Sequence, residues 1–147
     1  LIDIQGLGGR RLKDDWKDDL PTNFLGVLND GFPNLLMVLG PHTSRGNIPR
    51  HIEKIVDFNV ALIRHMREQG YSRVEARSEE AAKWLAQVVE VNKNRLAGKI
   101  PSWQTGVNAN VPGRQNIRVL GYYGGATRYR EIAEQVADGG YKELMFR

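Results

Sequence analysis

The segment from Asn47 to Gly70 constrains the fold of this 147-residue chain more than any other. Asn47 is a good helix N-cap, Pro49 is tolerated in a first helical turn, and Gly70 is a natural C-terminal stop. The apolar residues recur at helical spacing: Ile52, Ile55, Val56, Ile63 and Met66. The pattern predicts an amphipathic helix of about six turns, which must bury one face against the rest of the chain.

A continuous apolar run, residues 35–39, precedes this helix. Its length, and its flanks Pro33-Asn34 and Gly40-Pro41, predict a buried strand. A loop of small, polar and basic residues then leads to the helix. In α/β sheets, loops at the carboxyl ends of strands are common ligand positions, and a helix N-terminus offers free N–H groups. The strand–loop–helix unit is therefore a candidate binding site.

The remaining sequence predicts an α/β fold. The stretch "SRVEAR" reads as extended and leads to a second helix capped by Ser78, which ends near Gly98. The expected buried face of that helix consists of Ala81, Trp84, Leu85, Val88, Val89 and Leu96. "IRVLGYY" and "YKELMF" read as strands on either side of a short helix capped by Thr127. Residues 1–30 are expected to be mostly loop.

Residues 99–116 form a long loop rich in Gly, Pro and Asn. Long loops in compact domains are often functional. Trp103 lies in this loop, and two interpretations remain open. Its indole could cover a planar or phosphorylated ligand as part of a lid, or it could anchor the loop to the core.

The composition excludes several classes of protein. The chain has no cysteine, so neither a disulfide framework nor a thiolate metal site is possible, and this fits a cytoplasmic protein. No apolar run approaches the roughly 18 residues that span a bilayer. The first residues are too charged for a signal peptide. The chain starts at Leu1 rather than Met, which suggests part of a longer protein.

The common catalytic and ligand-binding motifs are weak or absent. "GLGGRR" lacks the third glycine of a dinucleotide fingerprint, and "DDWKDD" is typical of a solvated charge cluster. The three histidines have no metal-site spacing, and no serine-nucleophile motif is present. Several basic residues could contact phosphates: Arg45, Arg50, Arg114 and Arg118. They form no dense stripe with interleaved aromatic residues, so a nucleic-acid-binding domain is disfavoured.

An ordered series of blocks provides a more specific signal. "GFPNLLMVLGP", "GNIPRHIE", "PSWQTG", "NVPGR", "YYGG…YR" and "GGYKELMF" follow one another across nearly the whole chain. This series resembles the C-terminal part of flavin-dependent Baeyer–Villiger monooxygenases. The resemblance implies an enzyme that binds FAD and uses NADPH and O2. It implies a flavin C4a-peroxide that inserts one oxygen atom into a ketone, giving an ester or lactone.

The resemblance also implies roles for particular residues. Four positions are expected near the flavin: Gly40, Pro41, Asn47 and Ile48. Four positions are expected along the substrate pocket: Thr43, Ser44, Arg45 and Gly46. Trp103 matches the tryptophan that folds onto NADP+ when a control loop, about 99–116, closes. No residue of the chain is assigned a catalytic or metal-binding role.

The resemblance divides the chain into residues 1–70, the end of an FAD-binding domain, and residues 71–147, a C-terminal segment. The glycine-rich phosphate motifs of the family are missing, so the other part of the enzyme is an expected partner and the chain alone is expected to be inactive. The loop "GVNANVPG" is two residues longer than is common, which leaves open whether Leu120 or Gly121 faces the substrate. A non-catalytic interaction module remains an alternative.

Overall fold

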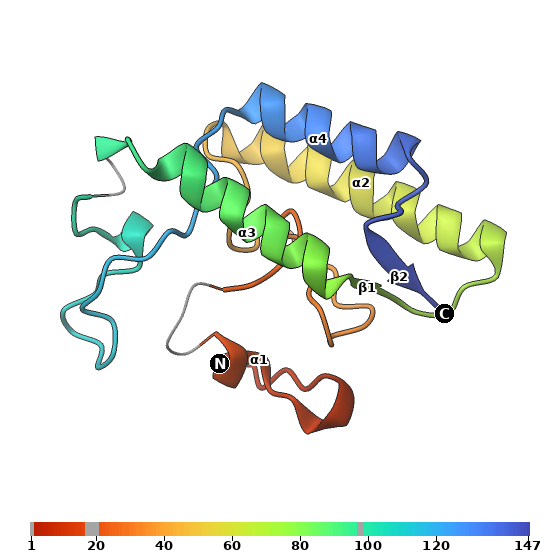
Figure 1. Ribbon diagram of the computed structural model, residues 1–147, viewed down its shortest axis with the longest axis horizontal. Helices are drawn as coiled ribbons and strands as arrows, with labels where there is room; N and C mark the ends of the chain where they lie inside the picture. The colour runs from red at the N-terminus through yellow and green to blue at the C-terminus, as the bar shows by residue number, and fades with distance from the viewer. Residues whose placement is uncertain (1, 17–20, 97–98) are drawn as a thin grey trace.

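The computed structural model describes residues 2–16, 21–96 and 99–147. Three helices dominate it: α2 (Ile48–Gln69), α3 (Ser78–Asn92) and α4 (Ala126–Asp138). Two short strands, β1 (Val74–Ala76) and β2 (Leu144–Phe146), form an antiparallel sheet. Helix α2 lies beside α4, and the two strands lie near one end of α3 (Figure 1). The predicted α/β class is confirmed.

Helix α2 forms where the sequence predicts it. The Asn47 side chain accepts a hydrogen bond from the Arg50 N–H at 3.1 Å, and Gly70 adopts the left-handed conformation with a φ of 73°. The buried face is rotated from the predicted one, because Val56 and Ile63 remain exposed. The residues that α2 buries are His51, Ile55, Phe58, Asn59, Leu62 and Met66.

Helix α3 differs from its prediction at both ends. Arg77 occupies the N-cap position, and Ser78 is already helical with its hydroxyl donating to Asp30 at 2.7 Å. The predicted Ser78 cap is therefore wrong. The helix ends at Asn92, and Gly98 lies outside the described residues. Leu96, beyond the helix end, is 71% exposed rather than part of the buried face.

The predicted strand at residues 35–39 is not present. Asn34 and Leu39 have positive φ angles, and these bend the backbone at both ends of the run. The Leu35 N–H donates back to Phe32, whereas the Met37 N–H donates to Val27, so no continuous ladder forms. Four of these apolar side chains are half-buried and Val38 is exposed, so the run lies at the surface of the described residues.

The predicted strand at residues 117–123 is also absent. One isolated parallel bridge joins Ser44 to Tyr122, and the Tyr122 N–H donates to Thr43 at 2.9 Å. The predicted Thr127 cap is wrong as well, because Gly125 precedes α4 without a side-chain cap. The closing strand is confirmed as β2, which pairs with β1 in the register Val74↔Phe146.

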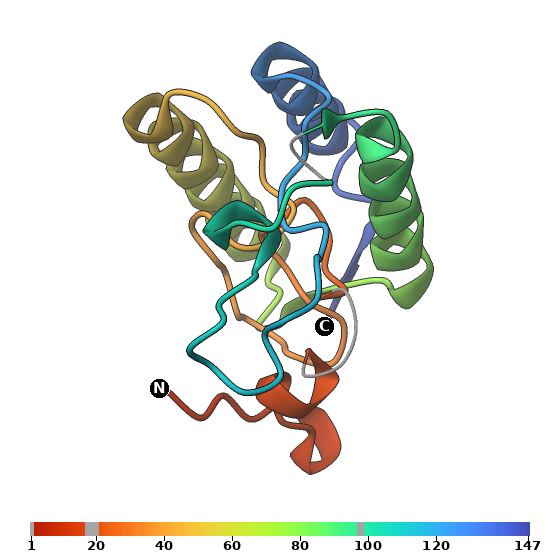
Figure 2. The same cartoon turned by 90° about the vertical axis from the view of Figure 1, so that its left-hand side faces the viewer.

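The core lies between the helices and the winding segment 23–28. Figure 2 shows α2, α3 and α4 around this segment, with the long loop 99–116 on the side facing the viewer. Trp84 of α3 stacks on Tyr122 at 5.1 Å between ring centroids, and both contribute to the core with Tyr129 of α4. The core draws on residues from both predicted segments, 1–70 and 71–147.

The N-terminal region forms short turns. Residues of "GLGGRR" make the 3-10 helix η1 (Leu7–Gly9), and α1 (Leu12–Asp15) follows. The second half of "DDWKDD" lies outside the described residues. Among the helices that the structure describes, none combines the length and the apolar character needed to cross a membrane.

Candidate functional site

The loop between Leu39 and α2 lines a hollow of about 380 Å³. Its other walls come from the N-terminal region and from the segment that follows the long loop. The lining residues are Trp16, Pro21, Leu39, Gly40, Pro41, Thr43, Ser44, Arg45, Ile48, Arg114, Arg118 and Leu120. The hollow thus combines an apolar wall with arginine side chains.

A buried histidine fixes this loop. The His42 imidazole lies 3.2 Å from the Asn23 side-chain amide through Nδ1 and 2.9 Å from the Val119 carbonyl through Nε2. The fitting arrangement has Asn23 donating to Nδ1 and Nε2–H donating to Val119, which requires a neutral ring. Burial lowers the pKa of His42 to about 4, against a smaller opposing effect of the Val119 carbonyl. His42 thus connects its own loop to the segments that contain Asn23 and Val119.

The structure brings most of the predicted site residues together. Gly40, Pro41 and Ile48 line the hollow, as do three of the four predicted substrate positions: Thr43, Ser44 and Arg45. Thr43 and Ser44 are buried, and the Thr43 hydroxyl donates to Gly40 within the loop at 2.9 Å. Gly46 is exposed and lies outside the residues lining this hollow.

Asn47 and Trp103 lie elsewhere. Asn47 uses its side chain to cap α2 and borders a second groove, of about 440 Å³, between α2 and α4. Trp103 begins the 3-10 helix η3 (Trp103–Thr105) and is 76% exposed. It lines a third hollow, of about 630 Å³, within the long loop. Trp103 therefore does not anchor the loop to the core.

The N-terminus of α2 offers fewer donors than the sequence suggests. Pro49 has no N–H, and the Arg50 N–H is already bound by the Asn47 side chain. Among the first three helical positions, Ile48 keeps an N–H without a partner in the described residues. Because Ile48 lines the hollow, its N–H and the positive end of the helix dipole are close to it.

The two residues left open by the lengthened loop differ in their positions relative to this hollow. Leu120 lines it, whereas Gly121 is buried against Arg45. A Cβ added to Gly121 would lie 2.4 Å from Arg45 Nε, so a larger residue would displace that side chain. The sequence gives no sign of Trp16 and Pro21 as wall residues, because their neighbours in the hollow are distant in the chain.

The groove between α2 and α4 contains two buried titratable groups. The Tyr129 hydroxyl donates to the Leu25 carbonyl, and burial raises the pKa of Tyr129. Burial lowers the pKa of His51, whose ring packs edge-on to Tyr129 at 4.9 Å.

No grouping of His, Asp and Glu in the part of the chain that the structure describes is suited to a metal ion.

Comparisons with known proteins show which sequences and structures the chain is similar to. No protein-family model matches the chain. The phenazine N-monooxygenase PhzNO1 of Lysobacter antibioticus is 38% identical over 141 residues, and a Baeyer–Villiger monooxygenase of Pseudooceanicola batsensis is 35% identical over 144. The aligned regions cover 96% and 98% of this chain, but only 25% and 26% of those relatives.

The solved structures give the same result. The chain superposes on cyclohexanone monooxygenase from Rhodococcus sp. Phi1, bound to NADP+, with a TM-score of 0.92 and 32% identity. That match covers 99% of this chain and 27% of the other. The chain is homologous to part of the Baeyer–Villiger and related monooxygenases. The resemblance predicted from the sequence is confirmed, and the chain spans about a quarter of the length of these relatives.

Related structures contain the expected cofactors. An NADP-bound steroid monooxygenase superposes with a TM-score of 0.85 at 30% identity, over 98% of this chain and 26% of its own. A further neighbour is a complex with FAD and NADP. The TM-score is 0.92 for a closed structure of cyclohexanone monooxygenase and 0.78 for an open one.

Proposed function

We propose that this chain is part of an FAD- and NADPH-dependent monooxygenase that inserts one atom of O2 into a ketone to give an ester or lactone. The proposal rests on one observation: a chain homologous to Baeyer–Villiger monooxygenases has a hollow at its Gly40–Ile48 loop. We expect its other walls to come from the polypeptide that corresponds to the remaining three quarters of the relatives. The chain alone would then be inactive.

The residues of the hollow fit a flavin. Gly40, Pro41 and Ile48 provide a narrow apolar edge for a planar ring, and the free Ile48 N–H suits an acceptor atom of that ring. Asn47 supports this edge indirectly, because its side chain caps α2 rather than lining the hollow. When bound, reduced flavin would supply the electrons that activate O2. The chain's own contribution is to position the ring and to exclude water.

We expect the substrate on the same side of the Gly40–Ile48 loop as the flavin. Thr43 and Ser44 use their buried hydroxyls within the loop, so they would shape the pocket rather than bind the ketone directly. Arg45 is the charged residue of this stretch that lines the hollow. Gly46 would leave space for the substrate at the exposed turn of the loop. A Cβ atom built on Gly46 would have no atom within 4 Å.

Trp103 is proposed as a lid residue that covers NADP+. Its indole is exposed, and its turn is held by a reciprocal pair in which the Thr105 hydroxyl accepts from the Ser102 N–H at 2.9 Å. A large planar side chain on such a turn is available to stack on a planar ligand.

Other surfaces support a larger assembly. Helix α2 leaves Val56, Val60 and Ile63 exposed along one side, which suits contact with further polypeptide. The absence of cysteine in the chain suits a reducing cytoplasm, where we place the protein.

The test is made on the complete protein that contains this chain. It should purify with a flavin absorption spectrum, and its NADPH oxidation should accelerate when a ketone is added. Ester or lactone should form in proportion to the NADPH consumed. A complete protein with neither flavin nor NADPH oxidation would rule out the proposed function.

A further inference from the structure

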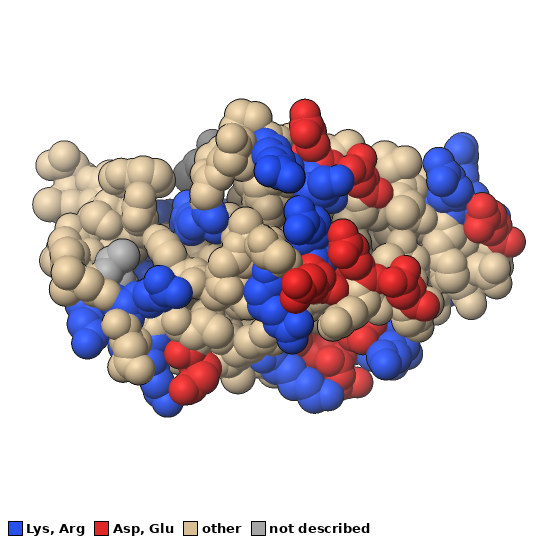
Figure 3. Space-filling view, turned by 90° about the horizontal axis from the view of Figure 1, so that it is seen from above, with Lys and Arg blue, Asp and Glu red and all other residues tan. Residues whose placement is uncertain are grey.

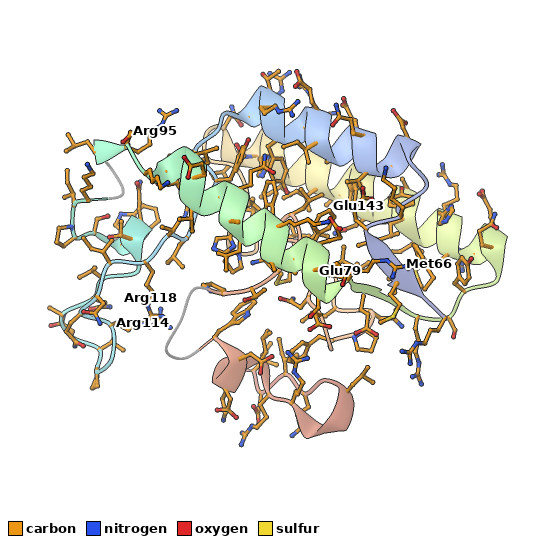
Figure 4. All side chains as sticks on the ribbon, in the orientation of Figure 1. Met66, Glu79, Arg95, Arg114, Arg118 and Glu143 are labelled. Atoms are coloured by element: carbon orange, nitrogen blue, oxygen red, sulfur yellow. The ribbon has the colours of Figure 1, made fainter. Side chains whose placement is uncertain are left out.

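The hollow at the Gly40–Ile48 loop combines positive charge with apolar surface. Three arginines line it: Arg45, Arg114 and Arg118. Its apolar and aromatic lining residues are Trp16, Pro21, Leu39, Pro41, Ile48 and Leu120. No aspartate or glutamate is among its described lining residues. Figure 4 shows Arg114 and Arg118 close together where the long loop returns toward the core.

Arg45 and Arg118 are the two arginines that the fold holds most closely at this hollow. Both are half-buried, whereas Arg114 is exposed. Arg45 donates from Nη2 to the Leu120 carbonyl at 3.3 Å, and its buried Nε has no partner in the described residues. Arg118 donates from Nη2 to the Gly113 carbonyl at 2.8 Å. These carbonyls orient the guanidinium groups without neutralising their charge.

The charge of the three arginines is not balanced within the described residues. None of them forms an ion pair with a described acidic residue. By contrast, basic and acidic side chains are interspersed over α2 and α4 (Figure 3), where Lys54 pairs with Asp57 at 3.4 Å. A half-buried guanidinium group without a counter-charge favours an anionic ligand, and burial strengthens that attraction.

We propose that the substrate is a ketone that also carries a carboxylate, which Arg45 and Arg118 bind. The inference rests on the proposed function, in which Arg45 belongs to the substrate stretch of the loop. A planar carboxylate matches a planar guanidinium group in a bidentate geometry. The apolar residues of the hollow would contact the carbon skeleton. The bound carboxylate would then fix how the ketone lies beside the flavin edge at Pro41 and Ile48.

The activity test compares two substrates that differ in charge, 4-oxocyclohexanecarboxylate and its methyl ester. The complete protein is assayed with Arg45→Gln, Arg118→Gln, the double variant and Arg45→Lys, and kcat/KM is measured for both substrates. Arg95→Gln is the matched control, because Arg95 is exposed, lies outside the hollow and is well separated from Arg114 and Arg118 in Figure 4.

The unaltered protein should prefer the acid to the ester. Each arginine replaced by glutamine should lower the acid-to-ester ratio of kcat/KM about tenfold, since hydrogen bonds between charged groups are among the strongest. The loss should appear mainly in the KM for the acid, because a remote carboxylate is bound in the ground state and the transition state alike. Arg45→Lys keeps the charge and should retain part of the preference. Arg95→Gln should leave the ratio unchanged.

Binding is measured separately with cyclohexanecarboxylate, which has the charge but no ketone to oxidise. Its Kd, from titration calorimetry, should rise about tenfold in each single glutamine variant. This measurement separates the inference from the proposed function. A protein without monooxygenase activity that still binds cyclohexanecarboxylate through Arg45 and Arg118 would support the carboxylate site and rule out the proposed function.

Three results would overturn the inference in a protein that is an active monooxygenase. The first is a preference of the unaltered protein for the ester. The second is an unchanged acid-to-ester ratio in the double variant, as a merely structural role of the arginines predicts. The third is a lower melting temperature of the double variant with an unchanged Kd for cyclohexanecarboxylate, because the arginines would then pair with acidic groups of the remaining polypeptide.

Discussion

At the scale of single residues, His42 makes the loop sensitive to pH. Its pKa is about 4 in the folded chain and about 6.5 when exposed, so the unfolded chain gains a proton first as the pH falls. The stabilisation is therefore complete above pH 6.5 and is lost between pH 6.5 and pH 4. We expect unfolding in urea to show about 2 kcal/mol less stability from this residue at pH 5 than at pH 7.

The control for this prediction is His42→Gln, whose amide can replace both hydrogen bonds without titrating. The variant should lose about 2 kcal/mol of the pH dependence, whatever its stability at pH 7. An identical pH dependence in both proteins would show that His42 is not the group responsible. His51 remains in both proteins, so its own lowered pKa cancels in the comparison.

Trp103 gives a second prediction at this scale. Trp103→Ala should weaken NADP+ binding and increase hydrogen peroxide release per NADPH in the complete protein, because an open site admits water. The FAD content should stay nearly intact, since Trp103 lies outside the hollow at the Gly40–Ile48 loop. Trp103→Phe keeps a planar ring and should retain most of the coupling. Unchanged coupling in Trp103→Ala would contradict the lid role.

At the scale of elements, the start of α2 depends on its cap. Asn47→Ala removes the acceptor of the Arg50 N–H and should cost about 1 kcal/mol of stability in urea unfolding. Asn47→Asp keeps an acceptor oxygen and should cost much less. If the two variants were equally destabilised, the contribution would come from another contact of Asn47.

The sequence predicts the elements whose signals are local. The Asn47 cap and the Gly70 stop are set by neighbouring residues, and the structure contains both. The terminal strand β2 also forms as predicted, although its partner β1 is distant in the sequence. The apolar run at residues 35–39 is misleading because composition cannot show a missing strand partner. The run bends at Asn34 and Leu39 instead. The buried face of α2 was also misplaced, since tertiary contacts select Phe58 and Leu62 over Val56.

The candidate site was only partly predictable. Family blocks in the sequence locate the loop at Gly40 and Pro41, and in the structure most of the predicted positions line one hollow. The sequence indicates Arg114 and Arg118 only as possible phosphate contacts, because their position beside the same hollow as Arg45 depends on how the long loop folds back. The role of His42 was not predicted, since its partners Asn23 and Val119 are distant in sequence.

At the scale of the whole molecule, we propose that this chain forms one wall of a site for oxygen transfer to a ketone. The most direct measurement is the fate of labelled oxygen in the complete protein. With 18O2, NADPH and a ketone, we expect one 18O atom in each molecule of ester or lactone formed. Product that carries no label, or NADPH consumed without any oxygenated product, would contradict the account.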